Sequence, residues 1–459
     1  MAESNFSLQK TLTMLLDEKK YHSLRDILST MNPADIAAIF DDLDQARLPL
    51  LFRLLPKELA AETFVEMEPE AQELLIQGFS DSELKEVIDE LYVDDAVDIV
   101  EEMPANVVQR ILTQAEPDMR KQINEILRYP EDSAGSIMTT EYVSLRPNMT
   151  VEEAILRIRR TGIDKETIYT CYVTRGHKLI GMVTVKTLLL CEDDDTLIED
   201  IMQEHVITVN TTDDQEVVAQ MFSKYDFLAL PVVDTENRLV GIVTFDDAWD
   251  VMEDEATEDM EKMAAMLPSE HPYMRSTPVE IWKNRIPWLL LLMISATLTG
   301  LVISHFETAL GVLPCLTAFI PMLMDTGGNA GSQACVSIIR GISLNEIEFR
   351  DLFRVVWKEI RVAVLCGVCL AAACFAKVML VDHLLMHNES VTTTVALVVC
   401  ISMALTVFMA KLVGSTLPLL AKKIGFDPAV MASPIITTIV DFLSLLVYFA
   451  FATALLRIG

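Results

Sequence analysis

Hydrophobic positions change their pattern near residue 282, where mixed polar and apolar sequence gives way to long apolar runs. A membrane crossing needs roughly 20 apolar residues, and five segments qualify. They are Pro287–Ser304, Leu310–Ile339, Val362–Val381, Val391–Ala410 and Ile435–Leu456. The pattern predicts an all-α transmembrane domain of five helices over residues 281–459, with the ends of that domain on opposite sides of the membrane.

The first part of the chain has the periodicity of short amphipathic helices. Between Met31 and Tyr129, apparent helix starts recur every 23 to 25 residues, at Pro33, Pro56, Asp81 and Pro104. A repeat of this length predicts stacked helical units. We therefore expect an N-terminal α-helical solenoid, rich in acidic residues, over residues 1–130.

After Tyr129, short β-like runs alternate with helices, and the pattern occurs twice. Ile137-Met138 corresponds to Ile201-Met202, and Gly181-Met-Val-Thr corresponds to Gly241-Ile-Val-Thr, at separations of 60 to 64 residues. With the run Leu230-Pro-Val-Val-Asp, this resembles a pair of cystathionine-β-synthase (CBS) domains, each a βαββα unit, over residues 131–195 and 196–250. Such α/β pairs are regulatory and often bind adenine nucleotides, so an adenine nucleotide is a possible ligand here.

The segment that follows is strongly acidic. Residues 246–259 hold eight Asp and Glu side chains and no Lys or Arg. Acids four residues apart on a helix, such as Asp246 with Asp250 and Asp250 with Asp254, repel one another. The sequence therefore predicts that a cation lies against an acidic connecting helix within residues 251–280, and a merely solvated acidic linker is the alternative.

The charge is divided unevenly between the two parts of the chain. Residues 1–281 carry 58 acidic and 24 basic side chains, whereas residues 282–459 carry 10 and 12. So acidic a surface attracts cations and repels phosphate backbones, which argues against nucleic acid as a partner. The eight cysteines lie mostly in apolar runs, and the chain starts with the polar Met1-Ala-Glu-Ser-Asn. We therefore expect no disulfides and a cytoplasmic N-terminus.

Basic residues near the apolar runs predict the orientation of the membrane domain. The loop 340–361 carries five Lys or Arg, and the connection between the fourth and fifth spans carries Lys411, Lys422 and Lys423. Loops of this kind lie on the cytoplasmic side. The stretches 304–309 and 382–390 contain no Lys or Arg. We expect a multi-pass protein of the plasma (inner) membrane whose C-terminus is external.

Polar residues inside the fifth span are the first candidates for function. Thr437, Asp441, Ser444 and Tyr448 follow one another at helical spacing, which places them on one polar stripe. A carboxylate at membrane depth must face protein or water. Asp441 is therefore predicted to line an ion pathway, or else to be a structural acid paired with a neighbouring helix.

The second span is unusually long and is interrupted by Pro314 and Pro321. These are followed by the run 325–333, Asp-Thr-Gly-Gly-Asn-Ala-Gly-Ser-Gln. Irregular or closely packed backbone at membrane depth occurs where it is buried in protein or lines a watery cavity. The run therefore predicts a pore wall, and small-residue helix packing is the alternative.

The order of the domains, the motif Pro321-x-x-x-Asp-Thr-Gly-Gly-Asn and the motif Asp427-Pro-Ala before Thr437-Thr-Ile-Val-Asp together resemble the MgtE family of magnesium channels. The resemblance covers essentially the whole chain. It implies a homodimer in the lipid bilayer, with a pore at the subunit interface lined by the second and fifth spans. It also implies that the acidic connecting helix is a plug, which closes the pore when cytosolic Mg²⁺ is abundant.

The resemblance also assigns residues, with Mg²⁺ as both the transported and the regulatory ion. Its candidates for the pore are Asp441, Asn329, Gly328, Thr437 and Asp325, the last with its role left open. Its candidate metal ligands are Asp441, Asp427 at the cytoplasmic pore mouth, Glu255, Glu258 and Asp259 of the plug, Asp214, Glu216, Asp226, Asp247 and Asp250 of the CBS pair, and Glu58, Asp94, Asp95 and Asp98 of the N-terminal domain. The acids of the last group could instead form a solvated face.

Elementary energetics agree with a channel. Moving a divalent cation inward across about 100 mV gains roughly 4.6 kcal/mol, so no energy source is needed, and no P-loop is seen. The main alternative is a secondary divalent-cation transporter, for Co²⁺ or Mn²⁺ or coupled to another ion, regulated by the CBS pair. A nucleotide sensor without transport leaves Asp441 unexplained. An enzyme is least favoured, because none of the seven histidines is paired with a plausible nucleophile or metal motif.

Overall fold

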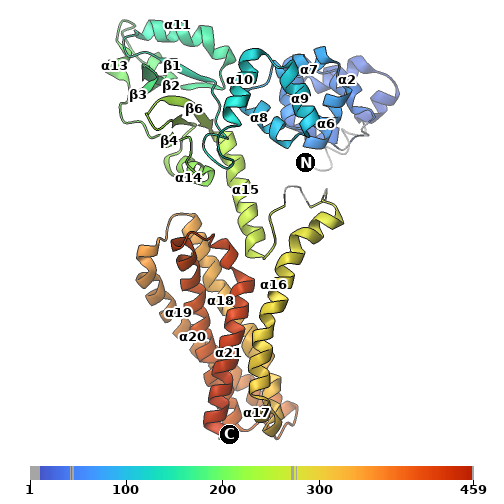
Figure 1. Cartoon of the computed structure of the whole chain (residues 1–459), viewed down its shortest axis with the longest axis vertical. Coiled ribbons are helices and arrows are strands. Elements are labelled where there is room, and N and C mark those ends of the chain that lie inside the picture. Colours follow the sequence, from blue (N-terminus) through green and yellow to red (C-terminus); the bar gives the residue numbers. More distant parts are fainter. Residues whose placement is uncertain (1–10, 42, 44–45, 270–272, 275, 457–459) are drawn as a thin grey trace. The chain divides into compact units, whose positions relative to one another are not determined.

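The computed structural model describes residues 11–41, 43, 46–269, 273, 274 and 276–456, and Figure 1 shows its elements. The chain divides into two compact units, Met1–Met252 and Glu253–Gly459. The first unit holds the helical repeats and the two sheets, and the second holds the long helices.

The N-terminal helices follow the predicted repeat. They are α2 (Tyr21–Leu28), α3 (Pro33–Asp41), α4 (Leu48–Phe52), α5 (Lys57–Val65), α6 (Pro69–Gly78), α7 (Asp81–Ile88), α8 (Val93–Glu102), α9 (Ala105–Gln114) and α10 (Pro117–Ile126). Helices α3 and α7 begin at Pro33 and Asp81, and Pro56 and Pro104 are the N-caps of α5 and α9. The four predicted helix starts are therefore confirmed.

Two three-stranded sheets follow, and they have the same topology. The first copy comprises β1 (Tyr142–Leu145), α11 (Val151–Thr161), β2 (Thr167–Arg175), β3 (Lys178–Thr184) and α12 (Val185–Leu189), and the second comprises α13 (Ile198–Ile201), β4 (Val209–Asn210), α14 (Gln215–Tyr225), β5 (Ala229–Val233) and β6 (Leu239–Thr244). In each sheet the first two strands are parallel and the last two are antiparallel. This confirms the two βαββα units.

The two copies exchange contacts in a pseudo-symmetric way. An isolated bridge pairs Thr139 with Ile242, and another pairs Met182 with Gln203. Both depend on glycine, since a Cβ at Gly181 would lie 2.6 Å from the sulfur of Met202, and one at Gly241 would lie 2.7 Å from that of Met138. The segment before the first strand of each copy therefore packs on the last strand of the other copy.

The acidic run lies in one helix, α15 (Phe245–Met263), which starts directly after the last strand of the second CBS copy. The first membrane helix, α16, begins at Pro278 behind a capping box of Thr277 and Glu280. The acidic run is therefore helical, and its helix starts before residue 251, where the connecting segment was predicted to begin.

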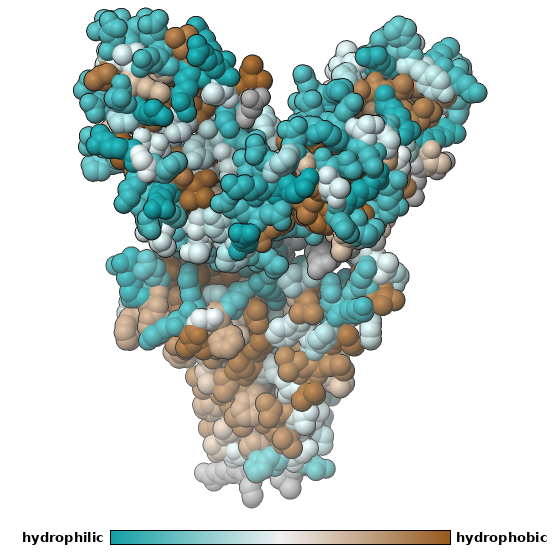
Figure 2. All heavy atoms as spheres, turned by 45° about the horizontal axis from the view of Figure 1, so that its top comes forward, coloured by the Kyte–Doolittle hydropathy of each residue, from teal (hydrophilic) through white to brown (hydrophobic). Residues whose placement is uncertain are grey.

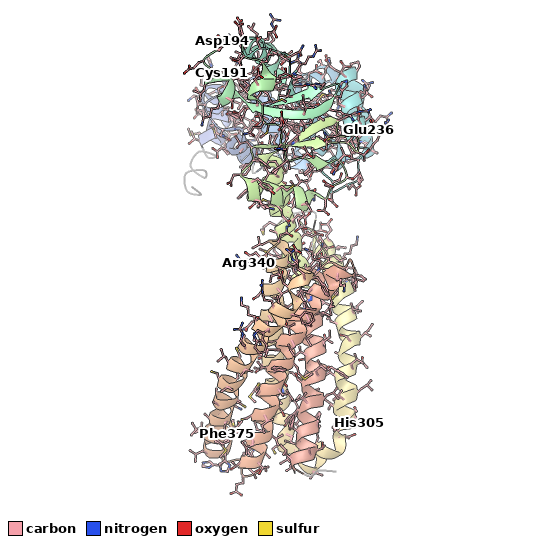
Figure 3. All side chains as sticks on the ribbon, turned by 90° about the vertical axis from the view of Figure 1, so that its left-hand side faces the viewer. Cys191, Asp194, Glu236, His305, Arg340 and Phe375 are labelled. Carbon is pink, nitrogen blue, oxygen red and sulfur yellow. The ribbon has the colours of Figure 1, made fainter. Side chains whose placement is uncertain are left out.

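The second unit consists mainly of long helices, over which the apolar residues gather in Figure 2. They are α16 (Pro278–His305), α17 (Glu307–Val312), the 3₁₀ turn η2 (Pro314–Phe319), α18 (Ile320–Ser343), η3 (Phe349–Asp351), α19 (Leu352–Lys377) with its π-helical extension η4 (Val378–Leu385), α20 (Thr393–Lys423), η5 (Ala429–Met431) and α21 (Ser433–Leu456). In Figure 3, His305 and Phe375 lie at one end of these helices and Arg340 lies at the other.

Within the described residues, four stretches are long and apolar enough to cross a membrane, and they contain α16, α19, α20 and α21. The remaining predicted span, the second along the chain, corresponds to α18, whose 24 residues would reach about 36 Å. Its glycines and polar residues lower its hydropathy, so the count of five spans stays a prediction. The predicted start at Leu310 is wrong, because Pro314 and Pro321 restrict the backbone there and the long helix begins at Ile320.

The sequence analysis placed Lys411 in a cytoplasmic loop, and this prediction is wrong. Helix α20 continues from Thr393 to Lys423, and Lys411 is buried inside it. Its ammonium group lies 3.9 Å from the carboxylate of Glu359 on α19. This acidic neighbour allows a lysine to remain inside the helix bundle, so the fourth membrane helix extends well beyond its apolar run.

Candidate functional site

Helix α18 carries the glycine run, and it is helical throughout. A Cβ at Gly327 would lie 2.6 Å from a methyl carbon of Thr406 on α20, and one at Gly328 would lie 2.9 Å from a methyl carbon of Thr437 on α21. The run therefore provides close helix packing, which the sequence analysis gave as the alternative to a pore wall. This packing brings the second and fifth predicted spans together.

The same two helices enclose a cavity of about 450 Å³. Its lining consists of Ile320, Pro321, Met324, Asp325, Gly328, Asn329, Thr437 and Asp441. The amide of Asn329 donates to Asp325 at 3.2 Å. One oxygen of Asp441, Oδ1, is buried without a hydrogen-bond partner in the part of the chain that the structure describes. All five predicted pore residues therefore lie in one cavity, and two carboxylates face it.

Only part of the polar stripe of α21 faces the cavity. Thr437 and Asp441 line the cavity, but Ser444 and Tyr448 are buried in the helix bundle. Ser444 donates to the carbonyl of Val440 at 2.6 Å, and Tyr448 donates to the carbonyl of Leu316 at 2.9 Å. Only the half of the stripe near Asp441 is therefore available to an ion.

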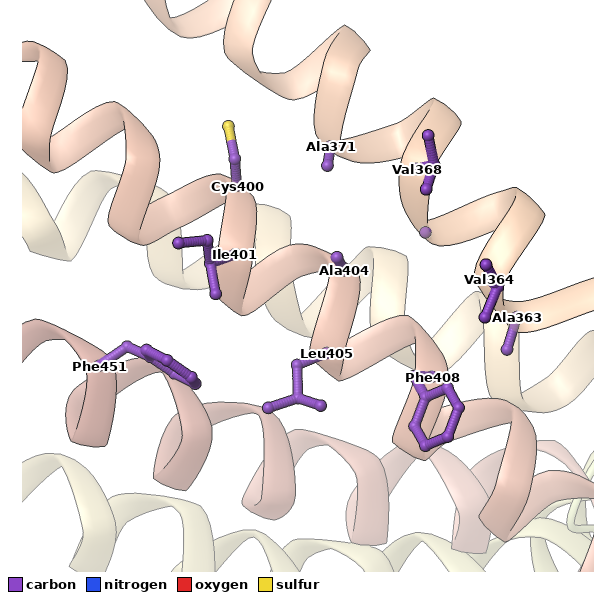
Figure 4. Close-up of a pocket in the computed structure, with 11 residues that line it drawn as sticks. Ala363, Val364, Val368, Ala371, Cys400, Ile401, Ala404, Leu405, Phe408 and Phe451 are labelled. Carbon is purple, nitrogen blue, oxygen red and sulfur yellow. The ribbon is translucent and has the colours of Figure 1, made fainter. Parts of the chain in front are cut away.

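A second cavity, of about 490 Å³, lies between α19 and α20 beside Phe451 (Figure 4). Alanine, valine, leucine, isoleucine and phenylalanine side chains line it, together with Gly367 and Cys400. It presents no oxygen ligand from a side chain. Mg²⁺ binds oxygen ligands, so the cavity at Asp441 is the better candidate for an ion site.

The end of α15 contacts residues of the membrane unit through charged groups. The ammonium of Lys262 lies 2.6 Å from Glu258 and 2.8 Å from Asp427, the residue predicted at the pore mouth. Burial lowers the pKa of Lys262, but its hydrogen bonds to Asp427 and Glu258 raise the pKa overall. The sequence predicted that a cation lies against the acidic run, and in this structure a lysine just beyond the run is such a cation.

Asp259 makes a second connection from the same helix. It accepts a hydrogen bond of 3.2 Å from the hydroxyl of Ser343, the last residue of α18. Burial raises the pKa of Asp259, and the nearby carboxylate of Asp427 adds to the rise. Glu255 is half-buried one turn earlier. The three predicted plug acids thus lie on the part of α15 that belongs to the membrane unit, and two of them make contacts at its end.

Several acids of the first unit are buried close together and repel one another. Asp94 is buried, and its Oδ1 has no hydrogen-bond partner among the described residues. Burial, and then repulsion by Asp247, raises the pKa of Asp94 well above its usual value and that of Asp95 to about 7. Burial also raises the pKa of Asp247 to about 6. Asp94 is therefore not on a solvated face, and a cation fits this group because it would relieve the repulsion.

Two further acids of this group were missed by the sequence analysis. Glu166 has a buried Oε2 without a partner in the described chain, and burial, followed by repulsion from Asp95, raises its pKa to about 8. Glu141 accepts a hydrogen bond from the backbone of Val93, at the start of α8. Glu141 directly precedes β1, and Glu166 directly precedes β2. No local pattern marks them, because the fold alone brings these segments to α8.

The remaining predicted sensor acids lie elsewhere. Asp214 caps α14, and Asp226 ends the same helix in the left-handed region, with φ of 54°. These two acids therefore lie at opposite ends of α14, and the assignment of Asp214, Glu216 and Asp226 to the CBS sensor stays a prediction. Glu58 and Asp250 have exposed side chains. Asp98, in contrast, belongs to the group around Asp94, because desolvation, followed by repulsion from Asp247 and Asp95, raises its pKa to about 7.

Direct ligation by the protein alone is limited. Among the described residues, no three His, Cys, Asp or Glu side chains converge closely enough to hold a metal ion. Mg²⁺ retains several of its waters in protein sites.

Comparison with known proteins agrees with this organisation. The profile described as MgtE intracellular N domain matches residues 31–132, that of the CBS domain matches residues 134–192 and 198–248, and that of MgtE, a divalent cation transporter, matches residues 320–451. A helical domain and a CBS pair joined to apolar helices that enclose two carboxylates define a regulated divalent cation transporter of the membrane. Members of this class are transporters and not enzymes, which agrees with the expectation from the sequence.

The chain belongs to the MgtE family. It is 37% identical to the magnesium transporter MgtE of Thermus thermophilus, over 98% of this chain and 99% of the relative, and 32% identical to that of Bacillus subtilis, over 97% of each. The cytosolic domain of an Mg²⁺ channel MgtE, solved with ATP, superposes with a TM-score of 0.51 at 38% identity, covering 53% of this chain and 99% of that one. The soluble part of a magnesium transporter matches with a TM-score of 0.51 at 34% identity, over 56% of this chain and 100% of that one.

Proposed function

We propose that the chain forms an Mg²⁺-selective channel that imports Mg²⁺ down the membrane potential and closes when cytosolic Mg²⁺ binds its acidic domains. The observation that carries the proposal is the buried, unpartnered Oδ1 of Asp441 in a cavity that also holds Asp325. A carboxylate without a partner at membrane depth is costly unless a cation or water faces it. The full-length magnesium transporters among its relatives support Mg²⁺ as that cation.

The pore requires two copies of the chain in this proposal. One cavity offers the carboxylates of Asp441 and Asp325, fewer oxygens than the octahedral shell of Mg²⁺ demands. A homodimer with Asp441 facing its symmetry mate would double the carboxylates and leave the remaining positions to water. Such a site selects by charge and by the size of the hydrated ion, and it needs no coupled energy source.

Closure is assigned to α15. Glu258 and Asp259 lie near Asp427 and Ser343, so a cation shared between the plug and the pore mouth would stabilise the closed arrangement. Sensor acids of the first unit repel one another, and bound Mg²⁺ would relieve the repulsion at Asp94, Asp95 and Asp247. Low Mg²⁺ then favours separation of these segments and an open pore.

The proposal includes an adenine nucleotide at the CBS pair. Its support is the relative whose cytosolic domain was solved with ATP, at 38% identity. Direct titration of ATP into the purified chain tests it.

An ion-coupled transporter is the second candidate, and one observation favours it. Glu359 and Lys411 form a buried pair at 3.9 Å, and Oε2 of Glu359 has no hydrogen bond within the described residues. A buried carboxylate of this kind could carry a proton. Mg²⁺ uptake into proteoliposomes that depends on a pH gradient would favour this candidate over the channel.

Two assays test the pore assignment. One is growth of a host that lacks Mg²⁺ transport, and the other is Mg²⁺ uptake into proteoliposomes, followed with a fluorescent Mg²⁺ indicator. Asp441→Asn should abolish rescue and uptake while leaving the protein folded. Ser444→Ala is the matched control, because Ser444 lies on the same helix and bonds only to the carbonyl of Val440. Rescue by Asp441→Asn at the level of the control would refute the assignment.

A further inference from the structure

One cavity of the first unit is lined by basic side chains, although this unit is strongly acidic as a whole. It has a volume of about 530 Å³ and lies in the first CBS copy. Its polar side chains are those of Ser144, Arg146, Asn148, Arg157, Thr174, Arg175, His177 and one acid, Glu199. Residues 142–180 carry seven Lys or Arg and four Asp or Glu, within a half of the chain that is otherwise strongly acidic.

The position of this cavity in the fold suits a ligand. Strands β1 and β2 are parallel, and Ser144, Arg146, Thr174 and Arg175 lie at or just beyond their carboxyl ends. Ligands of α/β folds commonly bind outside the carboxyl ends of parallel strands. The hydroxyls of Ser144 and Thr174 lie 3.1 Å apart and can also donate to an anion. The cavity therefore combines hydroxyl donors with guanidinium groups.

One acid, Glu199, faces the three arginines of the cavity and pairs with only one of them. Arg175 lies 3.7 Å from Glu199, and both side chains are largely exposed. Arg146 and Arg157 form no ion pair within the described part of the chain. Guanidinium groups bind phosphate through two parallel hydrogen bonds, and such charge-assisted bonds are about twice as strong as neutral ones.

The second CBS copy provides an internal comparison. The 60-residue offset between Gly181 and Gly241 places Thr235 and Asn237 where the first copy has Arg175 and His177. His177 and Asn237 both have positive φ, of 69° and 61°, which supports this equivalence. The starts of α11 and α14 likewise place Met221 opposite Arg157.

The turn of the second copy also carries Asp234 and Glu236, and Glu236 is labelled in Figure 3. Residues 206–240 hold two Lys or Arg and six Asp or Glu. The same fold therefore forms without the arginines, so folding does not explain their presence in the first copy.

We propose that this basic cavity is a binding site for a soluble phosphate-bearing small molecule, held by Arg146, Arg157 and Arg175 with the hydroxyls of Ser144 and Thr174. The site lies at the Arg175–Lys178 end of the β2–β3 hairpin, away from the Thr184 end. It would connect the channel to a phosphate compound independently of the Mg²⁺ acids. The proposal does not depend on the proposed pore.

Isothermal titration of pyrophosphate into the purified full-length chain without Mg²⁺ tests this site. We expect saturable binding to wild type, and Arg146→Gln with Arg157→Gln should weaken it at least about tenfold. The matched control is Arg159→Gln with Arg160→Gln, two exposed arginines of α11 outside the cavity, and it should change binding by less than about twofold. Absence of saturable binding, or an equal loss in both pairs, would overturn the proposal.

Two additional measurements complete the test. Arg175→Thr installs the residue that the second copy carries at this place, so it should leave the thermal stability unchanged and still weaken pyrophosphate binding. Adenosine, which lacks phosphate, should not displace pyrophosphate from wild type. Displacement by adenosine would place pyrophosphate in a nucleotide site and would refute a separate phosphate site.

Discussion

The ammonium group of Lys262 lies 2.8 Å from the carboxylate of Asp427, and thereby joins the last turn of α15 to the segment between α20 and α21. The same ammonium also lies 2.6 Å from Glu258. Two of the acids assigned to Mg²⁺ thus already share a monovalent cation that belongs to the chain. A lysine at this place can hold the plug near the pore mouth when Mg²⁺ is scarce.

Removal of this lysine should therefore open the channel at low Mg²⁺. A partly exposed ion pair is worth up to about 1 kcal/mol, so Lys262→Met should raise Mg²⁺ uptake at low internal Mg²⁺ by up to about fivefold. Lys262→Arg preserves the charge and is the control. Uptake by Lys262→Met at or below the wild-type level, measured in proteoliposomes, would show that the pair does not hold the plug.

Neutralising the plug acids should weaken inhibition by Mg²⁺. The triple variant Glu255→Gln, Glu258→Gln, Asp259→Asn removes the ligands but also removes repulsion in the closed state, and we expect the loss of ligands to dominate. Half-inhibition of uptake should then require more internal Mg²⁺ than in wild type. A variant that stays closed at every Mg²⁺ concentration would mean that the acids act mainly by repulsion.

The buried acids of the first unit should make stability depend on pH. The folded-state pKa is about 7 for Asp95 and about 8 for Glu166, above the usual values near 4. Protons therefore bind the folded state more tightly, so the contribution of these groups to stability is present below about pH 4 and is lost as the pH rises toward about 8.

Thermal unfolding of the full chain without Mg²⁺ checks this expectation. The apparent Tm should fall between about pH 5 and 8 because of these groups, and Mg²⁺ should reduce the fall by binding the ionised acids. Asp95→Asn with Glu166→Gln should flatten the profile. A profile that is as steep in this variant as in wild type would contradict the assignment.

Close packing of α18 predicts a large effect of one added methyl group. Gly327→Ala should destabilise the membrane unit by about 1–3 kcal/mol, because the new Cβ would lie 2.6 Å from Thr406. Gly300→Ala is the control, since nothing lies within 4 Å of the equivalent Cβ on α16. Thermal unfolding in detergent compares them, and equal Tm values would mean that the α18 contact can relax freely.

Local patterns in the sequence were sufficient for most of the fold. Helix starts at Pro33 and Asp81 follow from turn chemistry, and the offset of Gly181 and Gly241 revealed the two CBS copies. In the membrane unit, the spacing in α21 singled out Asp441 and the glycine run singled out α18, whereas the pairing of these two helices came from the family resemblance. These features are encoded within a few helical turns or one repeat, so periodicity detects them.

Long-range contacts could not be predicted in this way. Glu166 joins Asp95 only because the fold brings its segment to α8, and Lys262 meets Asp427 across 165 residues of sequence. The apolar count also ended the fourth span before Lys411, since burial of this lysine depends on Glu359 in another helix. Each of these cases concerns a charge whose partner lies on another element.

Single-channel recording from the purified chain in planar bilayers, over a series of cytosolic Mg²⁺ concentrations, tests the central claim most directly. The account predicts an inward Mg²⁺ current without any imposed Na⁺ or H⁺ gradient, which falls as cytosolic Mg²⁺ rises and is absent in Asp441→Asn. A current that requires such a gradient, or that persists unchanged in Asp441→Asn, would contradict it.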